Sequence, residues 1–377
     1  MSDLLSKPLS EDERFMAAAL DLGRRDLGQT WPNPAVGALI VAHRDGEPVI
    51  VGRGWTQRGG RPHAEAVALA EAGDAAFGAT IYVTLEPCSH QGRAGPCADA
   101  IIAAGIRRVV SAIEDPDERV KGDGHAKLRA AGIATTLGVM AEEATRAHRG
   151  HITRVLLGRP YILVKLALSA DEKVGLAGPS PLAITGPEAA AHVHMMRAES
   201  DAIMVGVGTV IADDPQLTCR LPGMEDRSPV RIVADSSLRI PLASRLVRTA
   251  RSVPLWVLTS PGASPERERL LADAGVEVIR VPVGVQGRLD LNTAMQSLGG
   301  RGITRLMVEG GPTLVADLLV NNLVDDMALL KSPVVVGEAG IAAFSEPADK
   351  LLSRCGFQPQ DDAITLGRDT LFRYSRM

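Results

Sequence analysis

One histidine and two cysteines have the residue types and the spacing of a catalytic metal site. His63, Cys88 and Cys97 offer one imidazole and two thiolates, which are ligands that zinc prefers. A catalytic zinc keeps its fourth position for water and makes hydroxide available near neutral pH. Glu65, two residues after His63, can carry a proton to a leaving group without binding the metal. We therefore predict that His63, Cys88 and Cys97 bind zinc and that Glu65 is catalytic.

The order of these residues, His-x-Glu followed by Pro-Cys and a second Cys, is typical of zinc deaminases that act on nucleobase-like rings. In that signature two residues separate the cysteines, whereas here residues 89–96 stand between Cys88 and Cys97. The alternative is that both cysteines are buried thiols and that the histidine lies on the surface. A proline before each ligand segment and the offset of the glutamate disfavour this alternative.

Three polar residues near these ligands are candidates for substrate binding. His90 and Arg93 lie between the two cysteines and could contact a ring carbonyl or a phosphate, because arginine suits bidentate phosphate binding. Asn33 stands between two prolines, and its amide can pair with both donors and acceptors of a heterocycle. The alternatives are solvated loop residues for His90 and Arg93 and simple turn chemistry for Asn33.

The segment that must position these residues alternates between helical and strand patterns, which favours an α/β sheet with helices on its faces. We expect Ser10 to cap the first helix and Glu13 to complete a capping box. Residues 158–160, Gly-Arg-Pro, break the pattern, so we place a domain boundary there, between residues 1–150 and 158–377. The predicted helices are 11–27, 64–72, 97–104, 124–131 and 140–157, and the predicted strands are 36–42, 49–54, 79–85, 107–112 and 133–137.

The second segment is also α/β and has two glycine-rich turns between a strand and a helix. The sequence is Gly-Val-Gly-Thr at residues 206–209 and Glu-Gly-Gly-Pro-Thr at residues 309–313. Such turns present backbone N–H groups to an anion, but neither is a complete dinucleotide fingerprint, and tight-turn chemistry explains them equally well. The predicted strands are 161–168, 202–205, 230–234, 255–259, 276–281 and 305–308, and the predicted helices are 188–199, 266–274 and 313–321.

Composition excludes several classes of protein. Aromatic residues make up 3% of the 377 residues and the formal net charge is -4, so the chain lacks the stacking faces and basic surplus of a nucleic-acid binder. The polar N-terminus is unlike a signal peptide, and no apolar run is long enough to span a membrane. Four cysteines in so long a chain do not form a disulfide scaffold. We therefore expect a cytoplasmic protein whose partner is a small molecule.

Several segments resemble the bifunctional deaminase/reductase family of riboflavin biosynthesis. They are PNPAVGALIV, HAEAVAL, YVTLEPCSHQGRAGPC and ADAIIAAGIRRVV in the first part, and RPYILVKLALSADEKV, RAESDAIMVGVGTVIADDPQLTCR and LMVEGGPTLVADLL in the second. The resemblance implies a cytidine-deaminase-like α/β/α sandwich as the zinc-dependent pyrimidine deaminase domain, residues 1–150. It also implies a dihydrofolate-reductase-like α/β domain as the NADPH-dependent reductase, residues 158–377. The resemblance covers most of the chain.

The resemblance further implies two reactions and their cofactors, Zn2+ and NADPH. The first is hydrolytic deamination of 2,5-diamino-6-(5-phosphoribosylamino)pyrimidin-4-one, and the second reduces the ribosyl chain of the product to ribityl. A homo-oligomer is also expected. The implied deaminase substrate contacts are Asn33, His90, Arg93 and Asp115. The implied cofactor contacts are Ala167, Thr209, Asp213, Gly311, Pro312, Thr313 and Leu314, and the implied reductase substrate contacts are Lys165, Arg197, Leu217, Arg220 and Glu309.

The chain departs from the family pattern at a few positions. The usual Asp-Pro-Asn-Pro reads Asp-Pro-Asp-Glu at residues 115–118, and Gly95 replaces a frequent proline. Glu172 stands where the family has glycine, which would strain a turn that requires a positive φ. Ala183 replaces an aromatic residue. The last two changes border the expected cofactor cleft and motivate the alternative of an active deaminase with an inactive reductase-like domain.

Two further hypotheses place the chain in different classes of protein. A nucleic-acid-editing deaminase is disfavoured by the acidity of the chain and by the lengthened segment between the cysteines. A zinc-stabilised structural protein would need a fourth protein ligand, such as Cys219, Cys355 or His90. The geometry around His63 distinguishes that class from an enzyme.

Overall fold

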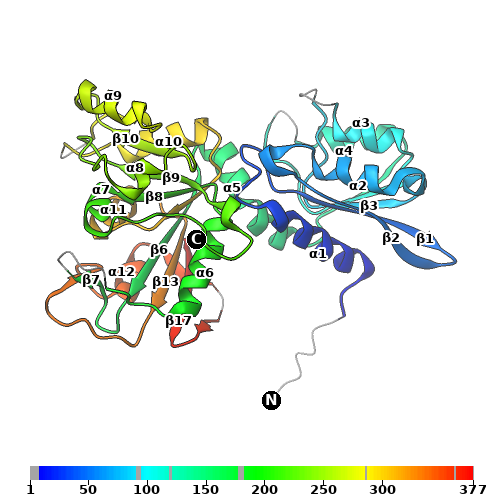
Figure 1. Ribbon diagram of the computed structural model, residues 1–377. Helices are drawn as coiled ribbons and strands as arrows, with labels where there is room; N and C mark the ends of the chain where they lie inside the picture. The colour runs from blue at the N-terminus through cyan, green and yellow to red at the C-terminus, as the bar shows by residue number, and fades with distance from the viewer. Residues whose placement is uncertain are drawn as a thin grey trace, which may run out of the picture. The chain divides into compact units, whose positions relative to one another are not determined.

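The computed structural model describes residues 8–90, 95–118, 121–176, 182–284, 287–360 and 362–376. The chain divides into two compact units, Met1–Gly158 and Arg159–Met377, each built around its own β-sheet (Figure 1). Among the described residues, no helix is both long enough and apolar enough to cross a bilayer.

The first unit is an α/β/α sandwich, as predicted. Its sheet has the strand order β2-β1-β3-β4-β5, in which β1 is antiparallel to both neighbours and β3, β4 and β5 are parallel. The strands are β1 (Gly37–Arg44), β2 (Glu47–Trp55), β3 (Thr80–Val83), β4 (Arg108–Ser111) and β5 (Ala134–Leu137). Helices α2 (Ala64–Ala72), α3 (Cys97–Ala103) and α4 (Asp123–Ala130) share one apolar core with the sheet, and α1 (Glu11–Gly23) and α5 (Ala141–Leu157) share another (Figure 1).

The first helix begins where the sequence predicts and ends earlier. The Ser10 hydroxyl accepts a hydrogen bond from the Glu13 N–H, and the Glu13 carboxylate accepts one from the Ser10 N–H, so the capping box is formed. The helix ends at Gly23 and continues as a 3-10 turn, Arg24–Asp26, rather than as α-helix to residue 27. A Cβ at Gly23 would lie 3.0 Å from the Ala35 carbonyl oxygen, so close packing against the entry to β1 requires glycine here.

Glycines in β2 let α2 approach the sheet closely. A Cβ at Gly54 would lie 2.0 Å from the Ala64 carbonyl oxygen, and one at Gly52 would lie 2.3 Å from the Ala68 carbonyl oxygen. Because His63 directly precedes α2, this contact between backbones also fixes where the histidine stands relative to the sheet.

The second unit is built on a ten-stranded mixed sheet with the order β11-β10-β9-β8-β12-β6-β13-β17-β15, and β16 pairs with β17. In this sheet β6, β8, β9, β10, β11 and β12 run parallel to one another, and β13 runs parallel to β6. Strand β17 is antiparallel to its neighbours. The strands are β6 (Tyr161–Leu168), β8 (Ala202–Gly206), β9 (Val230–Ala234), β10 (Leu255–Thr259), β11 (Glu277–Arg280), β12 (Arg305–Val308), β13 (Asp326–Lys331), β15 (Phe357–Pro359), β16 (Ile364–Leu366) and β17 (Asp369–Arg376).

The helices of this unit follow its strands. They are α6 (Pro187–Ala198), α7 (Val207–Asp213), α8 (Arg245–Arg248), α9 (Pro265–Asp273), α10 (Leu291–Gly300), α11 (Pro312–Val320) and α12 (Ala348–Arg354). A separate two-stranded sheet pairs β7 (Lys173–Leu176) with β14 (Gly340–Ala342). The sequence patterns indicated β6, β8 to β12, α6, α9 and α11, but not β7, α8, α10, α12 or the strands from β13 onward.

Gly54→Ala should destabilise the first unit, because the new Cβ meets backbone atoms of α2 rather than a side chain that could move. We expect a loss of about 3 kcal/mol in the free energy of unfolding, at the upper end for overpacking. Urea unfolding, followed by circular dichroism, measures this change in the free energy of unfolding. Gly262→Ala is the control, since a Cβ there meets nothing within 4 Å; an equal effect of both changes would contradict the prediction.

Candidate active sites

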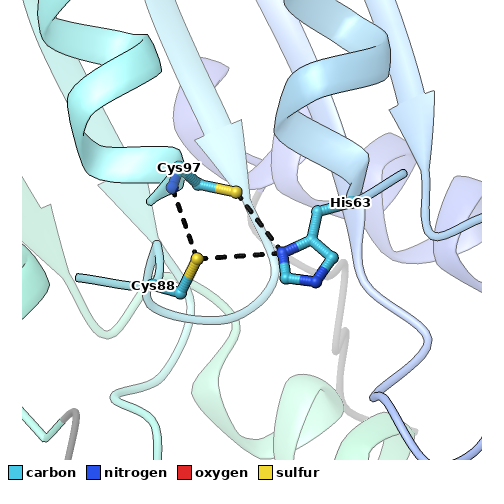
Figure 2. Close-up of side chains that lie close together, drawn as sticks. All are labelled: His63, Cys88 and Cys97. Atoms are coloured by element: carbon cyan, nitrogen blue, oxygen red, sulfur yellow. Dashed lines mark hydrogen bonds between the residues drawn. The ribbon is translucent and has the colours of Figure 1, made fainter. Parts of the chain in front are cut away.

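The three predicted zinc ligands lie together in the first unit. The ligand atoms of His63, Cys88 and Cys97 are within 4.8 Å of one another. His63 Nδ1 lies 3.8 Å from Cys88 Sγ and 3.4 Å from Cys97 Sγ, and Figure 2 shows the three side chains converging from separate segments. His63 caps α2, Cys88 lies in the loop after β3, and Cys97 is the first residue of α3.

This donor set fits a catalytic zinc. One imidazole and two thiolates are suitable ligands, and three protein ligands leave one position of the tetrahedron for water. Within the described part of the chain, no fourth histidine, cysteine or carboxylate joins the group. His90 is exposed, and Cys219 and Cys355 belong to the second unit. The geometry therefore favours an enzyme over the zinc-stabilised structural protein.

Glu65 lies in the first turn of α2 and is buried. Burial, reinforced by the nearby Cys88, raises the pKa of the Glu65 carboxyl to about 7. A hydrogen bond with Cys97 lowers the pKa of the Cys88 thiol to about 4, so this sulfur is poised as a thiolate. The site thus combines a thiolate ligand with a carboxyl group that can hold or release a proton near neutral pH.

Two of the expected substrate contacts are tied to the segments that carry the ligands. Asn33 donates a hydrogen bond from Nδ2 to the Gly60 carbonyl oxygen at 2.8 Å. Gly60 lies shortly before His63 in the chain. The backbone N–H of Asp115 donates a hydrogen bond to Glu86 Oε2 at 3.2 Å. Glu86 lies shortly before Cys88 in the chain. His90 is described and exposed, whereas Arg93 lies outside the described residues.

Sequence reasoning missed the buried carboxylate of Glu86. It accepts backbone hydrogen bonds from Asp115, Gly122 and His125, at 3.0–3.2 Å. A Cβ at Gly124 would lie 2.1 Å from the Pro87 carbonyl oxygen, so the start of α4 also packs tightly against the ligand loop. Glu86 therefore ties the loop after β3 to the loop after β4. Its place next to Pro-Cys was the only signal in the sequence.

The second unit contains a cavity of about 700 Å³, a size typical of ligand sites. All but one of the residues expected to contact the cofactor or the reductase substrate line it; the exception is Arg220, whose N–H donates to His194 Nδ1 at 3.3 Å. The lining residues are Lys165, Ala167, Arg197, Thr209, Asp213, Leu217, Glu309, Gly311, Pro312, Thr313 and Leu314.

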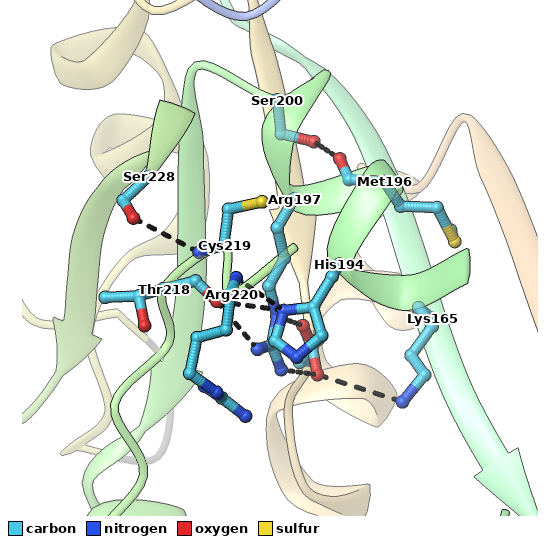
Figure 3. Close-up of polar contacts among 10 residues, drawn as sticks. Lys165, His194, Met196, Arg197, Ser200, Thr218, Cys219, Arg220 and Ser228 are labelled. Atoms are coloured by element: carbon cyan, nitrogen blue, oxygen red, sulfur yellow. Dashed lines mark hydrogen bonds and ion pairs between the residues drawn. The ribbon is translucent and has the colours of Figure 1, made fainter. Parts of the chain in front are cut away.

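A largely buried carboxylate between two cations lies in this cavity. Glu309 accepts from Arg197 Nε at 2.6 Å and from Arg197 Nη2 at 2.9 Å, and Lys165 Nζ lies 3.8 Å from Glu309 Oε2. Figure 3 shows the labelled side chains of Lys165 and Arg197, with dashed lines for their polar contacts. Burial alone raises the pKa of Glu309, but Lys165 and Arg197 outweigh it and the pKa is lowered. Burial lowers the pKa of Lys165, and Glu309 opposes that shift. Lys165 thus has the partner that a buried lysine requires.

Both glycine-rich turns border the cavity. Gly206 and Gly311 are the N-cap residues of α7 and α11, and a Cβ at Gly311 would lie 3.7 Å from Thr209 Oγ1. The two helix N-termini therefore lie close together, where their free N–H groups can hold an anion. This neighbourhood favours ligand binding over tight-turn chemistry alone.

Ser236, Arg239 and Arg288 also line the cavity and were not expected from the sequence. Ser236 and Arg239 lie in the segment after β9, just as the glycine-rich turns lie at the ends of β8 and β12. That segment, Asp-Ser-Ser-Leu-Arg at residues 235–239, is too short to give a periodic signal in the sequence.

The departures from the family pattern beside the cavity are accommodated. Glu172 does adopt a positive φ, 57°, the conformation that favours glycine. Its carboxylate accepts from the Ala348 N–H at 3.2 Å, and its carbonyl oxygen accepts from the Ala343 N–H at 3.1 Å. These bonds offset the cost of the conformation. Ala183 is exposed and is not among the residues that line the cavity.

Comparison with known proteins identifies both units. The cytidine and deoxycytidylate deaminase zinc-binding region matches residues 9–113, and the RibD C-terminal domain matches residues 160–357. The riboflavin biosynthesis protein RibD of Escherichia coli (strain K12) is 41% identical over 338 residues, which cover 87% of this chain and 89% of that protein. RibD of Aquifex aeolicus (strain VF5) is 40% identical over 327 residues, with 87% and 88% covered. The structure of Acinetobacter baumannii RibD matches with a TM-score of 0.84 and 33% identity, covering 97% of this chain and 99% of that one.

A zinc-binding deaminase domain and a reductase domain are thus joined in one chain. The chain belongs to the RibD family. It is a bifunctional enzyme of riboflavin biosynthesis, a deaminase and a reductase with Zn2+ and NADPH as cofactors, and it acts on a small pyrimidine molecule. The alternative of a deaminase with an inactive reductase-like domain is not favoured.

Glu309→Gln should destabilise the second unit, because it leaves two buried cations without their anion. We expect a loss of about 3–5 kcal/mol in the free energy of unfolding at neutral pH. Since the pKa of Glu309 is lowered in the fold, its contribution is fully present above about pH 4.3, the unfolded-state pKa, and is lost as the pH falls through the lower folded-state value.

Urea unfolding at several pH values measures the difference between Glu309→Gln and the unchanged protein, which should shrink below about pH 4.3. Glu277→Gln is the control, because Glu277 pairs with Arg301 at the surface and should contribute less than about 1 kcal/mol. Equal effects of the two substitutions would contradict a buried ion cluster.

Proposed function

We propose that the first unit deaminates 2,5-diamino-6-(5-phosphoribosylamino)pyrimidin-4-one and that the second reduces the ribosyl chain of the product to ribityl. The observation that carries the proposal is the convergence of His63, Cys88 and Cys97 beside a buried Glu65. We assign residues 1–150 to the deaminase domain and residues 158–377 to the reductase domain, with the end of α5 between them.

In the deaminase, His63, Cys88 and Cys97 would hold zinc, which supplies hydroxide near neutral pH when bound. Glu65 takes the proton of the attacking water and returns it to the departing amine. A carboxyl group that changes protonation near pH 7 suits both transfers.

Asn33, His90, Arg93 and Asp115 are the proposed contacts of the deaminase substrate. Because Asn33 uses Nδ2 to bind Gly60, its Oδ1 is available to accept from a ring amine. His90 and Arg93 are assigned to the ring carbonyl or the phosphate by their chemistry and by the family resemblance.

In the reductase, NADPH supplies hydride when bound. The converging N-termini of α7 and α11 suit its diphosphate, with Ala167, Thr209, Asp213 and the run Gly311–Leu314 as contacts. Lys165 can donate a hydrogen bond to the sugar carbonyl or its imine, since in the part of the chain that the structure describes Glu309 is the one acidic group paired with its ammonium. Leu217 and Glu309 are the other lining contacts of the substrate.

Of the two arginines assigned to the substrate, Arg220 is the better phosphate contact. Arg197 uses three of its five donors within the protein, on Glu309 and on the Thr218 carbonyl oxygen. We therefore assign Arg197 to holding Glu309 in place at the wall of the substrate site and Arg220 to the phosphate.

Strand order suggests how the cofactor lies. Residues at the carboxyl ends of β6, β12, β8 and β9 line the cavity in that spatial order, from Lys165 to Arg239. Three strand spacings are about 14 Å, comparable to the length of an extended dinucleotide. With the reacting nicotinamide near Lys165, the adenosine end falls near Ser236 and Arg239, where Arg239 can bind the 2′-phosphate.

A homo-oligomer, a cytoplasmic location and the absence of nucleic-acid or membrane partners remain part of the proposal. Four cysteines in 377 residues, two of them proposed as zinc ligands, support a reducing compartment.

Glu65→Gln should lower the rate of ammonia release about 10²- to 10⁴-fold, because a carboxamide cannot shuttle protons. Zinc content should stay near one ion per chain, and NADPH oxidation with the deaminated intermediate should be unchanged. The assay supplies the diaminopyrimidinone to zinc-loaded protein and follows ammonia, NADPH absorbance and product mass.

Glu71→Gln, on the exposed face of the same helix, is the matched control and should release ammonia at the unchanged rate. If Glu65→Gln retains full activity, Glu65 is not the proton shuttle. If the unchanged protein releases no ammonia from this substrate, the substrate assignment is wrong.

Arg239→Ala should raise the KM for NADPH about tenfold and leave the KM for NADH unchanged, because only NADPH carries the 2′-phosphate. Steady-state kinetics with the deaminated intermediate measure the KM for each cofactor. Arg248→Ala is the control, since Arg248 lies outside the cavity. A parallel rise for both cofactors would place Arg239 away from the 2′-phosphate.

A further inference from the structure

The altered loop after β4 is braced by a histidine from α5. Asp115 Oδ1 accepts from the backbone N–H of Asp117 at 3.0 Å and from His151 Nε2 at 3.1 Å. An ionised carboxylate is only an acceptor, so the imidazole must donate from Nε2. His151 is thirty-six residues away in the sequence, on a helix from another part of the unit.

The two donors on Oδ1 leave the other oxygen free. Among the described residues, none donates a hydrogen bond to Asp115 Oδ2. The Asp115 side chain is 13% exposed and that of His151 is 10% exposed, so the pair is nearly closed to solvent. The loop backbone is also held, through the bond from the Asp115 N–H to Glu86. Asp115 therefore presents one fixed acceptor.

Packing alone does not account for His151. Its Nδ1 is buried and has no hydrogen-bond partner among the described residues, which is unfavourable for stability. An apolar side chain would fill the same space without that cost. His148, one turn earlier on the same face of α5, instead bonds through Nε2 to Thr84 Oγ1, which accepts from the Gly37 N–H. His148 thus anchors the helix to the sheet, while His151 contacts a side chain of the site.

We infer that His151 is a positioning residue of the deaminase, which orients the Asp115 carboxylate so that Oδ2 accepts an N–H group of the aminopyrimidine. The inference rests on the proposed role of Asp115 in substrate binding.

The test compares His151→Leu, which fills space without donating, with His151→Gln, whose amide can donate from a similar position. His151→Leu should raise the KM of ammonia release about tenfold with less than a twofold change in kcat. His151→Gln should restore the KM to within about twofold of the unchanged protein. His148→Gln, on the same face of α5, should not change the KM.

Each preparation carries its own folding control, because NADPH oxidation with the deaminated intermediate reports the second unit and zinc content reports the first. If His151→Leu loses zinc, or if His151→Gln is as impaired as His151→Leu, the residue is structural and the inference is overturned. An unchanged KM in His151→Leu also overturns it.

Asp115→Ala separates the inference from the proposed function on which it rests. We expect a raised KM, and in the Asp115→Ala background His151→Leu should have no further effect, because its only target is gone. If Asp115→Ala has no effect, the substrate role of Asp115 and the inference both fail. If Asp115→Ala is impaired and His151→Leu is additive to it, the inference fails and the role of Asp115 stands.

Discussion

Carboxylates that accept hydrogen bonds from backbone N–H groups fix loops and strand ends in both units. A loop that leaves the end of a strand has N–H groups without ladder partners, and burying them unpaired is costly. Glu86 satisfies three such groups in the first unit. In the second, the buried Asp201 accepts from the N–H groups of Thr304 and Arg305, where β12 begins, and the partly exposed Asp171 accepts from Val336 and Gly337 beside the small sheet. One ionised side chain thereby fixes two or three loop residues at once.

Parallel strands then bring these loops to one edge of each sheet. In the first unit, Glu86 follows β3 and Asp115 follows the adjacent β4. In the second, Gly206 ends β8 and Glu309 follows the adjacent β12. Ligands of open α/β sheets bind at the carboxyl ends of the strands. The two units therefore place different chemistry by the same geometric means, and the identity of a few residues after each strand decides which chemistry results.

The cluster of His63, Cys88 and Cys97 was predictable because its signature is short and depends on fixed offsets. Strands β6, β9, β10 and β12 were predictable to the residue, since each is a compact apolar run. Residues that act through distant contacts were not. Nothing local marks His151 as a partner of Asp115, and in the sequence it is one polar position of a helix. The strands after residue 356 were missed because two of them have only three residues, too few to show alternation.

The charge balance of the second site shows why a composition that disfavours nucleic acid is still compatible with a phosphorylated ligand. The chain carries a formal net charge of -4, yet Glu309 is flanked by Lys165 and Arg197, so these three groups together carry one net positive charge. At physiological ionic strength, screening limits the range over which exposed charges interact to about 8 Å, whereas partly buried charges are screened less. The residues that line the cavity therefore set its potential, and an excess of one cation there favours an anionic ligand in an acidic protein.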